Sequence, residues 1–133
     1  MCTTPRLAII GAGPAGLSTA RVFLANASHF KIQLFEKDYS PGGLWHYPEH
    51  DKRHRVMYDQ LETNISKHLM KFSGFPFPQQ VPHFPWREDV YGYLSSYYKR
   101  FIKDQKNVAL HLNTSVISLS KNRDLWKVIT RNN

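Results

Sequence analysis

Short apolar runs, separated by glycine-rich or charged segments, make up the first part of the chain. An apolar run at residues 7–10 leads into a glycine-rich turn, and residues 17–25 continue as a predicted helix. A second apolar run begins at residue 31 and ends at Glu36. Two such runs on either side of a helical stretch predict a strand–helix–strand unit of about 30 residues.

One clear helical pattern and several short strand patterns follow in the second half. Val90, Leu94, Tyr97 and Phe101 share one face of a predicted helix over residues 87–103. Acidic residues lie in its first turn and basic residues near its end, the order that complements the helix dipole. Its tyrosines are expected to pack or to face solvent rather than to carry chemistry. Strands are then predicted at residues 108–112, 115–119 and 125–129, with a turn at 121–124.

The turn after the first strand carries Gly11-x-Gly13-x-x-Gly16, with Ala12, Pro14 and Ala15 between the glycines. In a strand-to-helix turn, the first glycine permits the tight turn, the second admits a pyrophosphate, and the third lets helix and strand pack closely. Pro14 suits the first helical turn, where its missing N–H would have no partner. The N-terminus of the helix favours an anion through its unpaired N–H groups and its dipole. The motif therefore predicts a dinucleotide site.

Glu36 ends the second strand twenty residues after Gly16. At this spacing a carboxylate accepts hydrogen bonds from a ribose diol and repels a 2′-phosphate, so FAD or NAD is favoured over NADP. A solvated strand end is the structural alternative. Together, the two motifs predict an α/β, Rossmann-like FAD/NAD(P)-binding fold, a parallel sheet with a β excursion.

Composition and charge exclude several other classes. The chain has 133 residues, enough for one domain, and a net charge of +8. Its Lys and Arg residues are dispersed and no nucleic-acid motif is present, so no nucleic-acid partner is expected. A single cysteine, Cys2, excludes an internal disulfide and fits a reducing compartment. No apolar stretch reaches the roughly 18 residues of a transmembrane segment, so a cytoplasmic protein is expected.

A loop with paired glycines and several histidines follows Glu36. Gly42 and Gly43 permit unusual backbone conformations, and Trp45 offers a flat surface for a ring system, although a core tryptophan in a turn is the alternative. His46, His50 and His54 recur at every fourth position. Pro48 breaks any helix there and no second ligand cluster exists, so no metal site is expected.

The following segments make the chain resemble a known family. Its motifs are Gly42-Gly-Leu-Trp45, Thr63-Asn64, Ser66-Lys67 with Met70, and Phe75-Pro-Phe-Pro78. In this order they are similar to the N-terminal part of a flavin-containing monooxygenase, and the likeness runs nearly from end to end. The resemblance implies that NADPH reduces bound FAD, that the reduced flavin captures dioxygen, and that a flavin hydroperoxide oxygenates a small amine or thiol. It also leaves open an association with the cytosolic face of the endoplasmic reticulum.

The resemblance also implies roles for individual residues. Asn64 matches the family's active-site asparagine, whose neutral amide can stabilise the oxygenating intermediate without adding charge, although a turn asparagine bonded to its own backbone is the bland alternative. Other implied cofactor contacts are Gly43, Leu44 and Trp45 at FAD, Thr63, Asn64 and Ile65 near flavin or nicotinamide, and Val116 near the adenine.

Two departures from the family pattern set further expectations. The chain has no second Gly-x-Gly-x-x-Gly motif for NADPH, and the family's Phe-x-Gly-x-x-x-His signature fails because Pro78 stands where histidine is needed. Residues 1–133 are therefore expected to be an incomplete member: the N-terminal part of the FAD-binding domain, without the NADPH-binding domain and inactive alone. The alternatives are a non-catalytic truncated product and a Baeyer–Villiger-type monooxygenase. A disulfide reductase is disfavoured because no Cys-x-x-Cys is present.

Overall fold

The computed structural model describes residues 4–26, 29–48 and 56–133. Its central element is a parallel sheet of β1 (Arg6–Ile10), β2 (Lys31–Phe35) and β3 (Val108–His111), in the order β1-β2-β3. Both predicted strands of the first unit are present, and the sheet is parallel as predicted. The α/β fold class is therefore confirmed.

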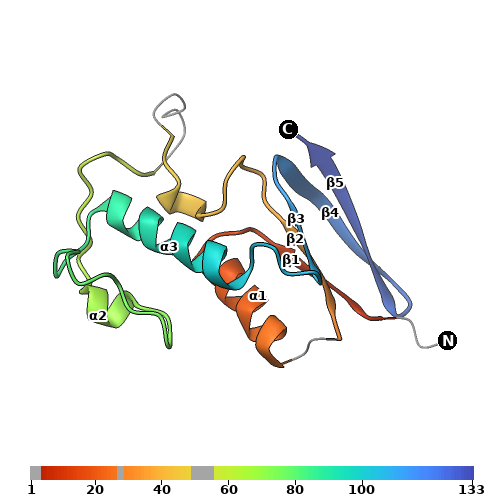
Figure 1. Ribbon diagram of the computed structural model, residues 1–133. Coiled ribbons are helices and arrows are strands. Elements are labelled where there is room, and N and C mark those ends of the chain that lie inside the picture. The colour runs from red at the N-terminus through yellow and green to blue at the C-terminus, as the bar shows by residue number, and fades with distance from the viewer. Residues whose placement is uncertain (1–3, 27–28, 49–55) are drawn as a thin grey trace.

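Two helices lie on one side of this sheet and a β-hairpin lies on the other (Figure 1). The helices are α1 (Pro14–Asn26) and α3 (Arg87–Phe101), and the hairpin is formed by β4 (Thr114–Asn122) and β5 (Leu125–Asn132). Two short helices, η1 (Gly43–Trp45) and α2 (Lys67–Met70), interrupt the long connection between β2 and α3. The hairpin is the β excursion that the sequence predicts.

The core lies between the sheet and the two helices. Ile32 and Leu34 of β2 and Leu17 and Ala20 of α1 are fully buried, each 0% exposed. Successive strand residues point to opposite faces, so the alternation in β2 directs these two side chains to the helices. The predicted apolar face of α3 joins the same core through three buried residues, Val90, Leu94 and Tyr97.

Helix α3 begins as predicted and ends two residues earlier than predicted. At its start, the Asp89 carboxylate accepts a hydrogen bond of 3.0 Å from the Trp86 N–H, which satisfies a donor at the helix N-terminus. At its end, the Lys103 N–H bonds the Tyr98 carbonyl at 2.9 Å, and Asp104 has φ 66°. This left-handed residue stops the helix because it turns the chain out of the helical path.

The connection from residue 57 to residue 86 is held by two side chains that reach across it. The Tyr93 hydroxyl accepts a 2.7 Å hydrogen bond from the Phe72 N–H and donates one of 2.7 Å to the Phe75 carbonyl. The Lys67 ammonium donates to the carbonyls of residues 78, 79 and 81. These contacts order a segment that has little regular secondary structure.

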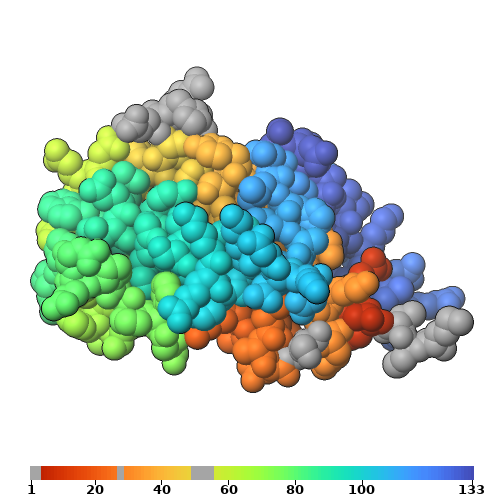
Figure 2. All heavy atoms as spheres, viewed as in Figure 1, coloured from red at the N-terminus to blue at the C-terminus, as the bar shows by residue number. Residues whose placement is uncertain are grey.

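The hairpin differs from its sequence prediction in the length of its turn. Asn122 pairs with Leu125, so the strands continue into the predicted turn at residues 121–124 and leave a two-residue connection. Arg123 has φ 53°, a left-handed conformation that permits this tight connection. The predicted boundaries were wrong here because the sequence has no glycine or asparagine–glycine pair to mark the position. Figure 2 shows the hairpin, in blue, at the opposite end of the molecule from the green residues of the long connection.

Candidate functional site

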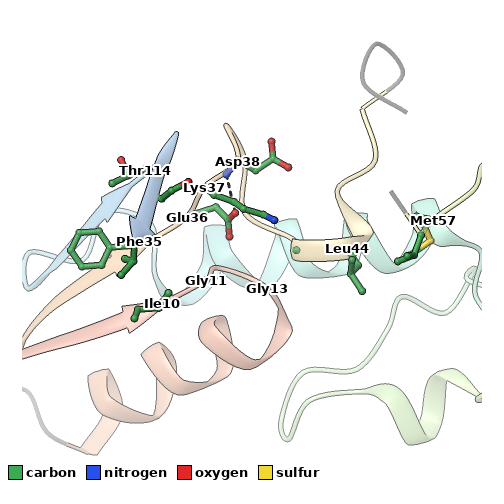
Figure 3. Close-up of a pocket in the computed structure, with 14 residues that line it drawn as sticks. Ile10, Gly11, Gly13, Phe35, Glu36, Lys37, Asp38, Leu44, Met57 and Thr114 are labelled. Atoms are coloured by element: carbon green, nitrogen blue, oxygen red, sulfur yellow. Dashed lines mark hydrogen bonds between the residues drawn. The ribbon is translucent and has the colours of Figure 1, made fainter. Parts of the chain in front are cut away.

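An open cleft of about 750 Å³ lies at the carboxyl ends of the parallel strands (Figure 3). In open α/β sheets this edge is where ligands bind. The cleft is lined by the ends of β1 and β2, by η1, by the start of β4 and by two residues of the long connection. The lining residues are Ile10, Gly11, Gly13, Phe35, Glu36, Lys37, Asp38, Gly43, Leu44, Val56, Met57, Thr114, Ser115 and Val116.

The glycine turn connects β1 to α1 and forms the floor of the cleft. Gly11 has φ +92°, a conformation that disfavours any side chain, and its N–H donates to the Phe35 carbonyl at 2.7 Å. Gly16 is needed for a different reason: a Cβ there would lie 1.9 Å from the Gly11 carbonyl oxygen. The first glycine therefore sets the shape of the turn, and the third allows α1 to pack against it.

Glu36 lies at the middle of the cleft and is only 5% exposed. Its Oε2 accepts a hydrogen bond of 2.7 Å from the Ala12 N–H, and its Oε1 accepts one of 2.9 Å from the Asp38 N–H. The solvated strand end considered for Glu36 is therefore wrong. Each carboxylate oxygen can accept more than one hydrogen bond, so Glu36 keeps acceptor capacity toward the cleft while its orientation is fixed.

The paired glycines pack against the first glycine turn. A Cβ on Gly43 would lie 3.0 Å from the Gly13 Cα, and the Gly42 N–H donates to the Ala12 carbonyl at 2.9 Å. A Cβ on Gly42 would also lie 2.9 Å from the Tyr91 ring of α3. The second loop is thus fixed against the first by close backbone contact, which sequence spacing alone does not reveal.

The two residues after Gly43 differ in their surroundings. Leu44 is 61% exposed and lines the cleft, where Figure 3 shows it beyond Gly13 as viewed from Glu36. Trp45 is partly buried against the core and does not line the cleft. The position of Trp45 favours the structural alternative for this residue, that of a core tryptophan in a turn.

Thr63, Asn64 and Ile65 do not line this cleft. Thr63 is buried, its hydroxyl donates to the Ile65 carbonyl at 2.9 Å, and its N–H donates to the Pro85 carbonyl at 3.0 Å. Asn64 and Ile65 are exposed. The structure therefore holds the segment in place through Thr63 and presents the Asn64 amide at the surface.

Several lining residues were missed by the sequence analysis. Thr114 and Ser115 join the cleft because the Thr114 N–H bonds the Glu36 carbonyl at 2.8 Å, and Val116 lines the cleft beside them. Lys37 and Asp38 come shortly after the end of β2 and could have been predicted from the rule that ligands bind outside the carboxyl ends of strands. Val56 and Met57 carry no comparable signal.

The remaining candidate chemistry is limited within the described residues. The His46 Nδ1 lies 3.3 Å from Asp38 Oδ2, and His50 and His54 fall outside the described residues. Cys2 also falls outside them. In the described ranges, no three His, Cys, Asp or Glu side chains form a group able to hold a metal ion. None of the helices described there is long and apolar enough to cross a membrane.

Comparison with known proteins gives the family. The model of a family described as flavin-binding monooxygenase-like matches residues 4–133. The chain belongs to this family. A flavin-binding monooxygenase family implies FAD as the cofactor. Nothing in the comparisons or in the structure supports the suggested association with the endoplasmic reticulum.

Two curated relatives illustrate the sequence similarity within this monooxygenase family. The chain is 51% identical over 126 residues to the thiol-specific monooxygenase of Saccharomyces cerevisiae, a match that covers 95% of this chain and 29% of the relative. It is 32% identical to flavin-containing monooxygenase 1 of Rattus norvegicus, with 94% and 24% covered. The chain therefore spans 29% and 24% of the length of these two relatives.

Solved structures of flavin monooxygenases share the fold. The S-allyl-L-cysteine S-oxygenase of Allium sativum matches with a TM-score of 0.79 and 28% identity, covering 98% of this chain and 33% of that one. A cyclohexanone monooxygenase bound to epsilon-caprolactone matches with a TM-score of 0.71 and 22% identity, covering 95% and 23%. At that identity the second likeness shows the fold alone.

Proposed function

We propose that the cleft binds FAD, with the diphosphate at the turn from Gly11 to Gly13, a ribose diol at Glu36 and the adenine beside Val116. The observation that carries this proposal is that these three features, predicted from separate segments, line one cleft. On this proposal, residues 1–133 are the N-terminal part of an FAD-binding domain.

The backbone at the floor of the cleft supports a diphosphate. A Cβ built on Gly11 meets no atom within 4 Å, so the turn is open on that side. A Cβ on Gly13 would instead lie 3.5 Å from the Gly43 Cα, so Gly13 packs against the second loop. Helix α1 begins at Pro14, directly after this turn, and is long enough to present a helix dipole. The N–H groups of its first turn favour phosphate oxygens without any side chain.

The order of the lining residues defines how FAD would lie. Figure 3 shows Thr114 and Phe35 at one end, Glu36 and Gly11 in the middle, and Leu44 and Met57 at the other end. With the adenine beside β4 and the diphosphate at the glycine turn, Leu44 and Met57 would be the residues that hold the isoalloxazine ring. Bound FAD supplies the activation of dioxygen and the transfer of one oxygen atom. The exposed apolar side chain of Leu44 would shield that ring from water on one side.

For Asn64 we propose the catalytic role that the family resemblance implies. The exposed amide can donate and accept hydrogen bonds without placing a charge near the reacting atoms. Thr63 positions it, because the two hydrogen bonds of Thr63 fix the backbone directly before Asn64. On this proposal, Thr63 and Ile65 also lie near the flavin or nicotinamide, because they flank Asn64 in the chain.

The proposed reaction oxygenates a soft sulfur or nitrogen nucleophile, with NADPH as reductant and dioxygen as oxidant. The relative with 51% identity is thiol-specific, which favours a thiol over an amine as the substrate of this chain's complete active site. Product analysis of a protein that contains this chain together with an NADPH-binding domain, with a thiol, an amine and a ketone in the presence of FAD and NADPH, tests this choice. Ester formation from the ketone would indicate a Baeyer–Villiger activity instead, and FAD binding without NADPH oxidation would indicate a non-catalytic FAD-binding chain.

Binding of FAD is tested by titration of the chain and of Glu36→Gln. The amide can accept hydrogen bonds with only one of its two terminal atoms, so it cannot hold both backbone N–H groups and a ribose diol. We expect the Kd for FAD to rise at least about tenfold, the cost of roughly one hydrogen bond to a charged group. Glu88→Gln, an exposed change in the first turn of α3, is the matched control and should bind as the unchanged chain does. Equal binding by both variants would contradict the proposed site.

A further inference from the structure

We propose that Lys37 is the side chain that binds the cofactor's diphosphate and makes this cleft select a 5′-diphosphate of adenosine. The inference rests on the proposed FAD site and adds a residue that neither the glycine motif nor the family resemblance identified. Lys37 is the only Lys or Arg among the described residues that line the cleft.

The backbone around Lys37 is fixed on both sides. The Glu36 N–H donates to the His111 carbonyl at 2.8 Å, and the Asp38 N–H donates to Glu36 Oε1 at 2.9 Å. The Lys37 carbonyl itself accepts a hydrogen bond of 2.8 Å from the side chain of Asn133, the residue directly after β5. The Lys37 backbone is therefore held in place at the edge of the cleft, and only its side chain is free to adopt different rotamers.

The side chain of Lys37 is exposed and extends along the cleft. Figure 3 shows it running from the end of β2 toward Leu44, on the same side of the sheet edge as the turn from Gly11 to Gly13. On the proposed order of the cofactor, this stretch lies between the ribose at Glu36 and the flavin end. The diphosphate is the part of FAD that occupies it.

The charges around the cleft favour a cation at this position, in addition to the N-terminus of α1. Glu36 and Asp38 both line the cleft, and Glu36 is almost completely buried. The Asp38 carboxylate accepts a hydrogen bond from the Tyr39 N–H and lies 3.3 Å from His46 Nδ1, so the Glu36 carboxylate is the charge that a diphosphate meets first. A diphosphate adds two negative charges, whereas the N-terminus of α1 offers only about half of a positive charge. An ammonium group within reach forms charge-assisted hydrogen bonds with phosphate oxygens and offsets the repulsion from the Glu36 carboxylate.

A 2′-phosphate is the other phosphate that a lysine next to Glu36 could bind. The Glu36 carboxylate is held facing the cleft by Ala12 and Asp38, and its charge repels a phosphate placed on the ribose hydroxyls. Lys37 is therefore assigned to the 5′-diphosphate. Adenosine 2′,5′-bisphosphate and ADP carry the same number of phosphates, but only the former has one on the 2′ position. Comparing their affinities therefore shows which phosphate Lys37 binds.

The test compares ligands and variants by calorimetric titration of the 133-residue chain. For Lys37→Gln we expect the Kd for ADP and for FAD to rise about tenfold at low salt, while the Kd for adenosine changes less than about twofold. Lys37→Arg should retain most of the ADP affinity because it keeps the charge. Added salt should weaken ADP binding to the unchanged chain more than to Lys37→Gln. Lys31→Gln, an exposed lysine at the opposite end of β2 from the cleft, is the matched control.

Each outcome bears on one of the two proposals. If the unchanged chain binds FAD and Lys37→Gln binds ADP equally well, the role of Lys37 is overturned and the FAD site stands. An equal loss of adenosine and ADP would show a merely structural effect and would also overturn it. A loss confined to adenosine 2′,5′-bisphosphate would reassign Lys37 to the ribose and overturn the diphosphate assignment. If the unchanged chain binds neither ADP nor FAD, both the proposed FAD site and the role of Lys37 are overturned.

Discussion

The two faces of the parallel sheet differ sharply in how they are covered. On the helix side, Ile32 and Leu34 are fully buried beneath α1 and α3. On the hairpin side, Ile10 remains 51% exposed at the end of β1, and Leu125 and Trp126 of the hairpin are 73% and 65% exposed. Figure 1 shows that the hairpin extends past the sheet rather than lying flat against it.

The two sides of the sheet therefore contribute differently: the helix side stabilises the fold, and the hairpin side contributes residues to the cleft. The helix side buries the apolar area that stabilises the fold, because the hydrophobic contribution grows with the apolar surface removed from water. The hairpin contributes to the cleft only through its first residues, Thr114, Ser115 and Val116. Substitutions on the helix side should therefore change the free energy of unfolding, whereas substitutions in the far part of the hairpin should change it little.

The largest expected effect is at the junction of the glycine turn and α1. Gly16→Ala places a Cβ 1.9 Å from the Gly11 carbonyl oxygen, so the helix must move away from the strand. We expect the free energy of unfolding to fall by about 3 kcal/mol or more, measured by urea denaturation. Gly92→Ala in α3 makes the same change where no atom lies within 4 Å, and should raise stability by about 0.5–1 kcal/mol. Similar losses at both positions would contradict the packing role of Gly16.

The next prediction applies one substitution to both faces of the sheet. Leu34→Ala leaves a cavity beneath the helices and should lower the free energy of unfolding by about 2–5 kcal/mol. Leu125→Ala removes the same atoms from an exposed position, and its effect should stay within about 0.5 kcal/mol. Urea denaturation of the two variants measures the contrast directly. A comparable loss from Leu125→Ala would show that the hairpin is covered after all.

A smaller effect is expected at the hydroxyl that holds the long connection. Tyr93→Phe leaves the Phe72 N–H and the Phe75 carbonyl without this partner, and should cost about 1–3 kcal/mol. Tyr58→Phe removes a hydroxyl from an exposed tyrosine and serves as the control, with no expected change. Thermal denaturation of both variants distinguishes them, and equal melting temperatures would refute the anchoring role.

The smallest predicted effect is a pH dependence that also originates on the helix side. Burial raises the pKa of Tyr93 above its ordinary value of 10.0, against a lowering by its hydrogen bond from Phe72, and burial also raises the pKa of Tyr98. The folded chain then keeps these protons after the unfolded chain has lost them, so their contribution to stability is present below pH 10 and is lost as the pH rises further. Urea titrations between pH 8 and pH 11, chosen as about two units below and one above that value, should show falling stability. Tyr93→Phe should fall less steeply, and an identical slope would contradict this assignment.

The parts of the fold that the sequence predicted are those where local pattern and packing agree. The first strand–helix–strand unit and α3 have apolar positions whose spacing matches the face that each buries. The connection from 57 to 86 was not predicted in this way. Its order depends on Lys67 and Tyr93, which bond backbone atoms 11 to 21 residues away along the chain, and no local pattern indicates such contacts.

The site was predictable to a similar degree. Gly11, Gly13 and Glu36 follow from motif spacing, because one turn and one strand end place them at the same sheet edge. The contact between Gly43 and Gly13 joins segments thirty residues apart and became visible only in three dimensions. Val116 was placed by family resemblance, since nothing in its own sequence context distinguishes it from the rest of an exposed hairpin.

The central claim is that FAD binds at the carboxyl edge of the sheet, and NMR titration of the isotopically labelled chain with FAD tests it most directly. We predict that the amide signals of Gly11, Gly13, Leu44 and Ser115 shift with a common Kd. Signals at the far end of the hairpin, such as that of Leu125, should stay unchanged. Shifts confined to the hairpin, or no shifts at saturating FAD, would contradict the account.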